Sequence, residues 1–276
     1  MTDAASTFDL DRIGGRRALD ALISEILAAG EFALSLSRSG FATVDKPDGS
    51  PVTEADKGVE ARLRAHVEQA HPTASFLGEE SGEKEGDGLR FIVDPIDGTR
   101  AFVRGLSTWS VLCGIEYEGV PVVGIAFMPA EDDFYLAVAG EGARRNGRAV
   151  GVGSVEALDR ATVAHGALNQ FTLDGRTNLL EALAKETYSQ RGLHDFDGYR
   201  QLLLGRVDAM VDPGVTGWDI CAAAVLVREA GGRLTSLEGE ETVFGGGAIA
   251  SNGKIHDPLL ALTARCRMAT GTNSHD

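Results

Sequence analysis

The stretch FIVDPIDGT, residues Phe91–Thr99, decides how this sequence folds around its functional groups. Its three leading apolar residues predict a compact buried strand that delivers Asp94 to the strand's carboxyl end. Pro95 holds its own φ at about −65° and turns the chain, which brings Asp97 back close to Asp94. We therefore expect two carboxylates to face one point.

The residues after this turn suit an anion. Gly98 lets the backbone approach a ligand closely, Thr99 offers a hydroxyl, and the following residues can open a helix whose free N–H groups face the same point. Carboxylates beside anion-binding amides need a cation between them, and a hard divalent metal that bridges protein oxygens to a phosphate meets that need. The alternative is that Asp94 only closes an Asx turn at the strand end.

The charge balance of the chain excludes several classes of partner. Its 276 residues include 26 Lys+Arg and 41 Asp+Glu, a net charge of −15, whereas nucleic acids and anionic membranes attract clustered Lys and Arg. We therefore expect no nucleic-acid partner and no membrane partner. The 35 glycines exceed the usual share of roughly 7% and predict many tight turns.

The cysteines and the N-terminal residues favour a cytoplasmic location. Cys113, Cys221 and Cys266 are far apart and form no CxxC pair, so we expect reduced thiols and no zinc or redox motif. The first residues lack the apolar segment of a signal peptide. No apolar run reaches the ~18 residues that a membrane span requires.

The hydrophobic pattern predicts an α/β protein with two different halves. The elements expected in the first half are helices at 17–37 and 54–69 and strands at 91–93, 109–117, 120–128 and 134–139. Those expected in the second half are strands at 161–165, 207–211 and 248–251 and helices at 178–186, 199–204, 218–230 and 257–265. Short turns make the first-half strands antiparallel neighbours, whereas the second half alternates strand and helix. We expect an α+β sub-domain over 1–150 and an α/β sub-domain over 151–276.

Four segments resemble known motifs. The segment Asp94–Thr99 resembles the signature of the inositol monophosphatase family of magnesium-dependent phosphatases. Three further segments are similar to that family's motifs in the same order: Lys46–Asp56, Gly78–Ser81 and Trp218–Gly232. The resemblance covers nearly the whole chain, and it implies a layered αβαβα sandwich that forms a homodimer.

The resemblance also implies a set of metal ligands. Glu79, Asp94 and the carbonyl of Ile96 would hold one ion, while Asp94, Asp97 and Asp219 would hold another. The first sub-domain would then carry most of the ligands, and the second would contribute Asp219 and the substrate pocket. Because every ligand is a carboxylate or a backbone oxygen, the set selects Mg²⁺, with Mn²⁺ as the alternative, over zinc. Two or three ions are expected.

Catalytic roles follow from the same resemblance. Thr99, polarised by Asp56, would act with Glu79 to orient and deprotonate the attacking water, and the amides of Gly98 and Thr99 would hold the phosphate. Each role has an alternative. Asp56 also fits the third position of a helix capping box, Glu79 fits a solvated acidic loop, and Asp219 fits the start of a helix, where the helix dipole favours an acid.

Two segments indicate the substrate. Residues 194–199 (HDFDGY) and 205–213 (GRVDAMVDP) resemble the histidinol-phosphate phosphatase subgroup. Histidinol phosphate carries an ammonium and an imidazole, which acids such as Asp195 and Asp212 would suit, with Asp219 beside them. The alternatives are myo-inositol 1-phosphate, whose hydroxyls carboxylates also accept, and a broad range of sugar phosphates. A non-catalytic, metal-binding regulator is the hypothesis from another class.

Three positions depart from the family pattern. Ala101 stands where the family usually has asparagine, Ser107 where it has proline, and His194 where it has glycine. These departures leave the proposed phosphatase chemistry intact and bear on the identity of the substrate.

Overall fold

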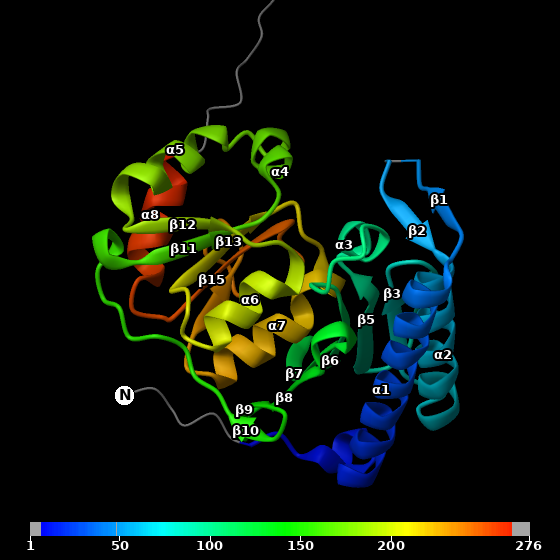
Figure 1. Cartoon of the computed structure of the whole chain (residues 1–276). Helices are drawn as coiled ribbons and strands as arrows, with labels where there is room; N and C mark the ends of the chain where they lie inside the picture. The colour runs from blue at the N-terminus through cyan, green and yellow to red at the C-terminus, as the bar shows by residue number, and fades with distance from the viewer. Residues whose placement is uncertain (1–6, 48, 267–276) are drawn as a thin grey trace, which may run out of the picture. The chain divides into compact units, whose positions relative to one another are not determined.

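The computed structural model describes residues 7–47 and 49–266, which form two compact units (Figure 1). The first unit takes in the described residues up to Val150 together with Asp195–Asp197 and Gly217–Ala230. The second takes in Gly151–His194, Gly198–Thr216 and the described residues from Gly231 onward. Helix α7 (Gly217–Glu229), which carries Asp219, therefore belongs to the first unit.

An eight-stranded sheet forms the centre of the first unit, in the order β10-β9-β8-β7-β6-β5-β3-β4. Its strands are β3 (Ser75–Gly78), β4 (Gly82–Lys84), β5 (Leu89–Asp97), β6 (Ser110–Tyr117), β7 (Val120–Met128), β8 (Asp133–Val138), β9 (Gly142–Arg145) and β10 (Arg148–Ala149). The antiparallel pairing predicted for the three consecutive strands is confirmed as β6, β7 and β8. β3 and β5 are the one parallel pair of this sheet. The buried strand predicted at 91–93 is longer than expected and runs through Pro95 to Asp97.

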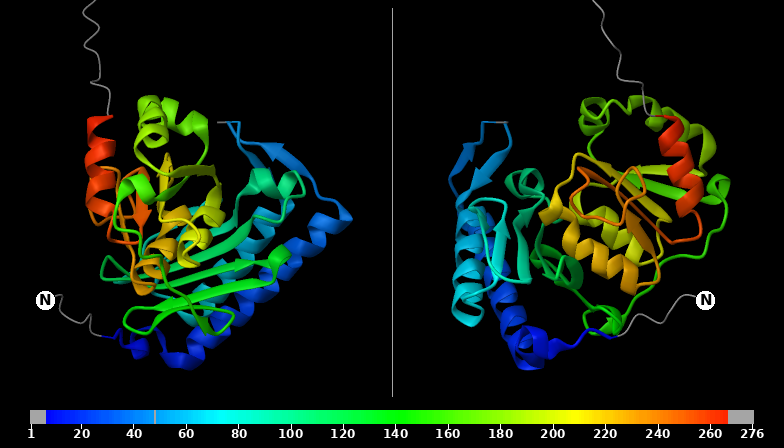
Figure 2. Two further views of the ribbon diagram at one scale, coloured as in Figure 1. Left: turned by 60° about the vertical axis from the view of Figure 1, so that its left-hand side comes forward. Right: turned by 180° about the vertical axis from the view of Figure 1, so that it is seen from behind.

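Helices cover this sheet. α1 (Gly15–Ser39) and α2 (Glu54–Ala70) lie side by side along it (Figures 1 and 2), and their apolar residues join those of the strands in one core. α7 packs on strands β5–β8. Gly30 weakens α1 as a helix former, but a Cβ there would lie 2.5 Å from the Phe127 ring. The glycine therefore lets α1 approach β7.

Several short elements were not predicted. The first unit has a hairpin of β1 (Thr43–Asp45) and β2 (Pro51–Thr53); its one-turn helix α3 (Thr99–Val103), by contrast, is the helix expected after Gly98. The second unit has β12 (Ser189–Gly192), β14 (Arg233–Thr235) and α4 (Leu168–Leu173). Most of these segments are too short or too polar to show a periodicity.

A five-stranded sheet forms the second unit, in the order β12-β11-β13-β15-β14. The remaining elements are β11 (Thr162–His165), β13 (Ala209–Pro213), β15 (Gly247–Ser251), α5 (Thr177–Glu186), α6 (Asp195–Leu203, whose first three residues belong to the first unit) and α8 (His256–Arg265). β12, β11 and β13 are parallel, whereas β15 runs antiparallel to both its neighbours. The expected α/β class of the chain is confirmed, and the second-half sheet is mixed.

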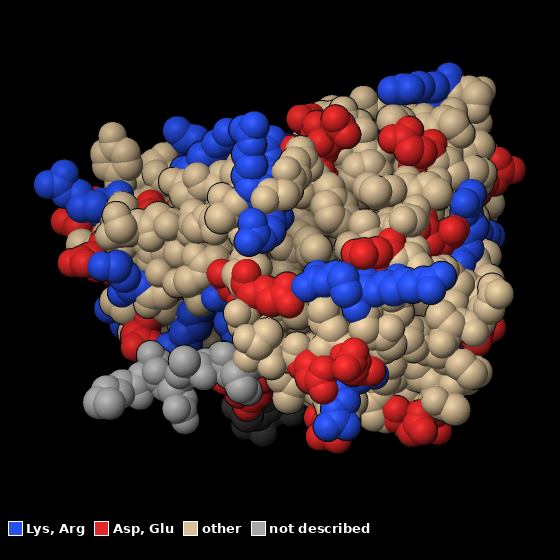
Figure 3. All heavy atoms as spheres, turned by 90° about the horizontal axis from the view of Figure 1, so that it is seen from below, with Lys and Arg blue, Asp and Glu red and all other residues tan. Residues whose placement is uncertain are grey.

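The surface carries both signs of charge. On the face seen in Figure 3, acidic side chains lie beside Lys and Arg side chains rather than in one acidic patch. The three cysteines are buried and free. Among the described residues, no helix combines the length and the apolar character that crossing a bilayer requires.

A buried histidine in the second unit makes stability depend on pH. His256 is fully buried, with Nδ1 2.9 Å from the Ser251 hydroxyl and Nε2 3.0 Å from the Thr235 hydroxyl. Burial, and secondarily the charge of Arg233, lowers the pKa of His256 from 6.5 to about 4. Between these two values the unfolded chain binds a proton that the folded chain does not, so the free energy of unfolding falls as the pH falls.

Replacing His256 should remove this dependence. Between pH 7 and pH 5 we expect wild type to lose about 2 kcal/mol more unfolding free energy than His256→Gln, measured by urea denaturation at both pH values. Between pH 8 and pH 9, where the histidine is neutral in both states, the two proteins should change equally. Equal losses between pH 7 and pH 5 would contradict the assignment.

Candidate active site

Strand β5 supplies two acids to one point. Residues three apart on a regular strand point to opposite faces, but the pairing of β5 with β6 shifts register between Asp94 and Asp97. This irregularity breaks the alternation. Asp94 and Asp97 are only 2% and 4% exposed. The Asp94 Oδ1 atom also accepts the Ile96 N–H at 3.0 Å, so the Asx-type hydrogen bond considered as an alternative coexists with the paired carboxylates.

Two donors hold Asp97 in place. Its Oδ2 atom accepts the hydroxyl of Ser110 at 2.8 Å and the backbone N–H of Phe196 at 2.8 Å. Ser110 lies directly opposite Asp97 on β6, and Phe196 lies in the first turn of α6. Neither contact was predicted from the sequence, because both join segments that are distant along the chain.

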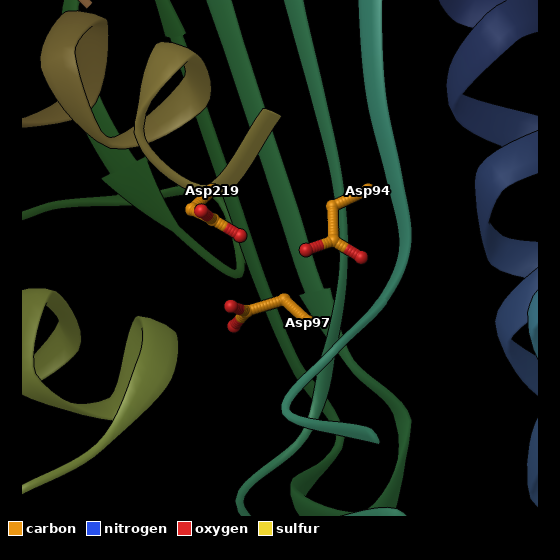
Figure 4. A group of neighbouring side chains, drawn as sticks. All are labelled: Asp94, Asp97 and Asp219. Atoms are coloured by element: carbon orange, nitrogen blue, oxygen red, sulfur yellow. The ribbon is translucent and has the colours of Figure 1, made fainter. Parts of the chain in front are cut away.

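Helix α7 adds a third acid. Asp219 lies in its first turn, and Asp94, Asp97 and Asp219 each offer an oxygen within 4.8 Å of the other two (Figure 4). Among residues 7–47 and 49–266, this is the one such group of three or more His, Cys, Asp or Glu side chains. The start of α7 thus accommodates Asp219 both as a first-turn acid and as a member of the cluster.

The cluster repels itself electrostatically. Burial, followed by the charges of Glu79, Asp97 and Asp219, raises the pKa of Asp94 well above its usual value. Burial, followed by the charges of Asp195 and Asp219, raises that of Asp97 in the same way. A divalent cation would relieve this repulsion, and three carboxylates are the donors that a hard cation such as Mg²⁺ prefers. The residues therefore fit such an ion.

Glu79 adjoins the cluster and is held by a lysine. It follows β3 directly, and its Oε1 atom lies 2.8 Å from Lys46 Nζ, which also lies 2.6 Å from Glu80 Oε1. Burial raises the pKa of Glu79, and the hydrogen bond and charge of Lys46 oppose that shift only in part. Burial lowers the pKa of Lys46, but the two glutamates more than offset it, so the net shift is upward. Lys46 belongs to the Lys46–Asp56 motif and was not predicted as a site residue.

Asp56 serves two structures with its two oxygens. Its Oδ2 atom accepts the Thr53 N–H at 2.7 Å and completes the capping box of α2. Its Oδ1 atom lies 3.0 Å from the Thr99 hydroxyl, which also lies 3.0 Å from the carbonyl of Ile96. The capping role and the contact with the predicted catalytic threonine are therefore both present. Burial raises the pKa of Asp56, although hydrogen bonds from Thr53 and Thr99 oppose it.

Asp195 lies against Gly98. Gly98 has a left-handed backbone with φ of 85°, and a Cβ there would lie 2.7 Å from Asp195 Oδ2. Both observations require glycine at this position. Asp195 itself has φ of 54°, which is uncommon for a residue with a side chain. The sequence indicated Gly98 for ligand approach, and the structure adds a neighbouring carboxylate.

Asp212 belongs to the second unit, near the end of β13. It is 5% exposed, and the Tyr199 hydroxyl lies 3.3 Å from its Oδ2 atom. A Cβ at Gly166 would clash with its Oδ1 atom, so the carboxylate is packed directly on the backbone that follows β11. The carboxyl ends of the parallel strands β11 and β13 thus carry this acid, which is where ligands of open α/β sheets usually bind.

Comparisons with known proteins agree with these motifs. A model of the inositol monophosphatase family matches residues 17–269. The chain is 37% identical to a histidinol-phosphatase of Mycobacterium tuberculosis, over 85% of this chain and 94% of the relative. It is 30% identical to an inositol-1-monophosphatase of Mesorhizobium japonicum, over 88% and 94%. The structure of an inositol monophosphatase from Anabaena superposes with a TM-score of 0.78 at 27% identity, covering 90% of this chain and 95% of that one. The chain therefore belongs to the inositol monophosphatase family of phosphoric monoester hydrolases.

Proposed function

We propose that this protein hydrolyses the phosphate monoester of a small cationic metabolite with Mg²⁺, and that L-histidinol phosphate is its leading substrate. The observation that carries the proposal is the convergence of Asp94, Asp97 and Asp219 within 4.8 Å. Two buried acids beside a half-buried third are costly unless a cation compensates them. A regulator that binds metal without catalysis would not need the Thr99 hydroxyl held between Asp56 and the Ile96 carbonyl.

The chain's residues would divide the work as follows. Glu79, Asp94 and the Ile96 carbonyl would hold one Mg²⁺, and Asp94, Asp97 and Asp219 would hold a second. Three ions are the alternative count, and Mn²⁺ is the alternative metal. When bound, such ions lower the pKa of a coordinated water and neutralise charge on the transferred phosphoryl group.

The protein would supply proton transfer and positioning. Thr99 would orient the attacking water through its hydroxyl and pass a proton toward Asp56, 3.0 Å away, while Glu79 accepts a hydrogen bond from the same water. The amides of Gly98 and Thr99 would hold the phosphate in line with that water. General acid–base catalysis of this kind contributes about 10²- to 10⁴-fold.

The acids proposed for substrate binding support a cationic leaving group. Asp195 lies against Gly98, and its charge acts on Asp97. Asp212 is a buried acid at the end of β13. An ammonium and an imidazolium are attracted to carboxylates by their charge, whereas the hydroxyls of an inositol offer them hydrogen bonds alone. The 37% identity with a histidinol-phosphatase supports the same choice.

The test is phosphate release from a panel of monoesters with and without Mg²⁺. We expect kcat/KM for L-histidinol phosphate to exceed that for myo-inositol 1-phosphate and for sugar phosphates, with no release in EDTA. A preference for myo-inositol 1-phosphate would favour the second candidate, which the 30% identity with an inositol-1-monophosphatase supports. Absence of Mg²⁺-dependent release from every ester would contradict the proposed activity.

Asp212→Asn tests the substrate assignment at the residue level. Loss of a charge-assisted contact should lower kcat/KM for L-histidinol phosphate by about 10- to 100-fold and change it much less for a neutral ester such as myo-inositol 1-phosphate. Steady-state kinetics with both esters measures the difference. Equal losses of kcat/KM for the two esters would show that Asp212 does not bind a positive charge of the substrate. The homodimer and the cytoplasmic location remain predictions.

A further inference from the structure

A second acid of helix α2 holds the segment that carries Glu79. Glu60 is 2% exposed and lies four residues after Asp56 on the helix. Its Oε2 atom accepts the backbone N–H of Glu80 at 2.8 Å, and its Oε1 atom accepts that of Ser81 at 2.7 Å. The Ser81 hydroxyl also donates to Oε1. All these donors belong to the turn between β3 and β4.

The turn is fitted closely to this carboxylate. β3 and β4 pair through Gly78 and Gly82, which leaves Glu79, Glu80 and Ser81 as the connecting residues. A Cβ at Gly78 would lie 2.5 Å from the Glu60 carboxylate, so glycine is needed for the carboxylate to reach the turn. Residues four apart on a helix lie on one face. The same face of α2 therefore holds Thr99 through Asp56 and the Glu79 turn through Glu60.

Charge alone does not explain this contact. Glu60, Glu79 and Glu80 are three acids in one region, and Lys46 pairs with the last two. A buried carboxylate without strong donors would be costly there, and the two amides and one hydroxyl of the turn provide those donors. In return, the carboxylate fixes the backbone on the C-terminal side of Glu79, while Lys46 holds its side chain.

We propose that Glu60 is a positioning residue that orients Glu79 for metal binding by capping the Glu79–Ser81 turn. This inference rests on the proposed role of Glu79 as a metal ligand. Without the Glu60 carboxylate, the backbone N–H groups of Glu80 and Ser81 lose their acceptor. The Glu79 side chain can then move with Lys46 away from Asp94. Groups that orient a metal ligand in this way typically change metal affinity by about 10- to 100-fold when they are removed.

The experiment is calorimetric titration of the full chain with Mg²⁺ alone. Glu60→Gln keeps the length and one acceptor oxygen, but it presents an NH₂ group to one of the amide donors. We expect it to raise the Mg²⁺ Kd by about 10- to 100-fold, and the Mg²⁺ concentration for half-maximal activity to rise in parallel.

The matched control is Asp133→Asn, which also disrupts a buried carboxylate, one that accepts hydrogen bonds from Arg145 at 2.7 and 2.8 Å. Asp133 lies on β8, which β7 and β6 separate from β5, so its loss should lower Tm and leave the Mg²⁺ Kd unchanged.

Two further variants make the outcomes distinct. Glu79→Gln should weaken Mg²⁺ binding at least as much as Glu60→Gln. If Glu79→Gln leaves the Kd unchanged, the proposed ligand is wrong and this inference falls with it. If Glu79→Gln weakens binding and Glu60→Gln does not, the proposed metal site stands and the positioning role is overturned. Should Glu60→Gln not fold, the milder Ser81→Ala removes only the Ser81 hydroxyl, which donates to Glu60 and accepts hydrogen bonds from Arg64 at 3.0 and 2.6 Å, and we expect a Kd increase of about 3- to 10-fold. An unchanged Kd in Ser81→Ala would then overturn the inference.

Discussion

Asp94→Asn should lower Mg²⁺-dependent phosphate release by about 10³-fold or more and, in EDTA, should raise the Tm above that of wild type. The first effect follows because Asp94 is a member of both proposed ligand sets, and a metal ion contributes several kcal/mol to such reactions. The second follows from repulsion, since burial and the charges of Glu79, Asp97 and Asp219 raise the pKa of Asp94. Asparagine removes that charge and keeps an oxygen for the Ile96 N–H.

The sign of the pH effect follows from the same pKa. An acid whose pKa is raised by folding is ionised in the unfolded chain at a lower pH than in the folded chain, so metal-free stability falls as the pH rises above 3.8, the usual value. The penalty is therefore present at neutral pH, where Asp94→Asn removes it. Each kcal/mol recovered would raise the Tm by about 2–4 °C for a chain of this size.

Differential scanning fluorimetry with EDTA and with Mg²⁺ would measure both consequences. Wild type should gain stability on adding Mg²⁺, and Asp94→Asn should gain little. Asp133→Asn should show the opposite pattern in EDTA, a lower Tm, because its carboxylate is paired with Arg145. A variant of Asp94 that turned over at the wild-type rate, or that melted below wild type in EDTA, would refute the metal site.

Thr99→Ala should lower kcat by about 10²- to 10³-fold, with KM changed little. The Thr99 hydroxyl is 3.0 Å from both Asp56 Oδ1 and the Ile96 carbonyl, a geometry that suits it to orient and deprotonate water. Loss of one preorganised group in an active site typically costs this much in rate. Thr99→Ser keeps the hydroxyl and should retain most of the activity, as steady-state kinetics would show.

The capping box provides the control for Thr99. Thr53 donates its hydroxyl and its N–H to the other oxygen of Asp56, and Thr53→Ala should cost about 1 kcal/mol of unfolding free energy with only a small change in kcat. If Thr53→Ala lost as much kcat as Thr99→Ala, the main contribution of Asp56 to the rate would be its role in the capping box of α2, and not its contact with Thr99. Full activity in Thr99→Ala would exclude the hydroxyl from the reaction.

Long periodic segments were predicted well because their signals are local. The helices at 17–37 and 54–69 correspond to α1 and α2, and the antiparallel strands correspond to β6, β7 and β8. The β1–β2 hairpin was not predicted, because its strands have three residues each and show no clear alternation. Gly30 is a poor helix former, and only the packed structure shows that the Phe127 ring occupies the space where a side chain at this position would lie.

The candidate site also has one part that the sequence predicted and one part that it did not. The turn Asp94–Thr99 could be predicted because proline and glycine dictate backbone geometry over a few residues. The partners that hold it were not, since Ser110 and Phe196 reach Asp97 from positions that no sequence spacing connects to it. Glu60 gave one usable signal, its spacing of four residues from Asp56.

The sequence by itself determined the class of fold, the family and the residues of the acidic cluster, because each depends on short motifs and on periodicity. Only the tertiary structure decided which oxygens meet. It placed α7, with Asp219, in the first unit beside β5. It brought one oxygen of Asp56 to the N-terminus of α2 and the other to Thr99. It also brought the Glu60 carboxylate within hydrogen-bond distance of the backbone after Glu79. The physical reason is that burial and hydrogen bonding between distant segments are properties of the packed chain. Burial and these long-range hydrogen bonds determine how strongly the carboxylates of the cluster repel one another, which is the repulsion that a metal would relieve. Neither can be predicted from a local sequence pattern.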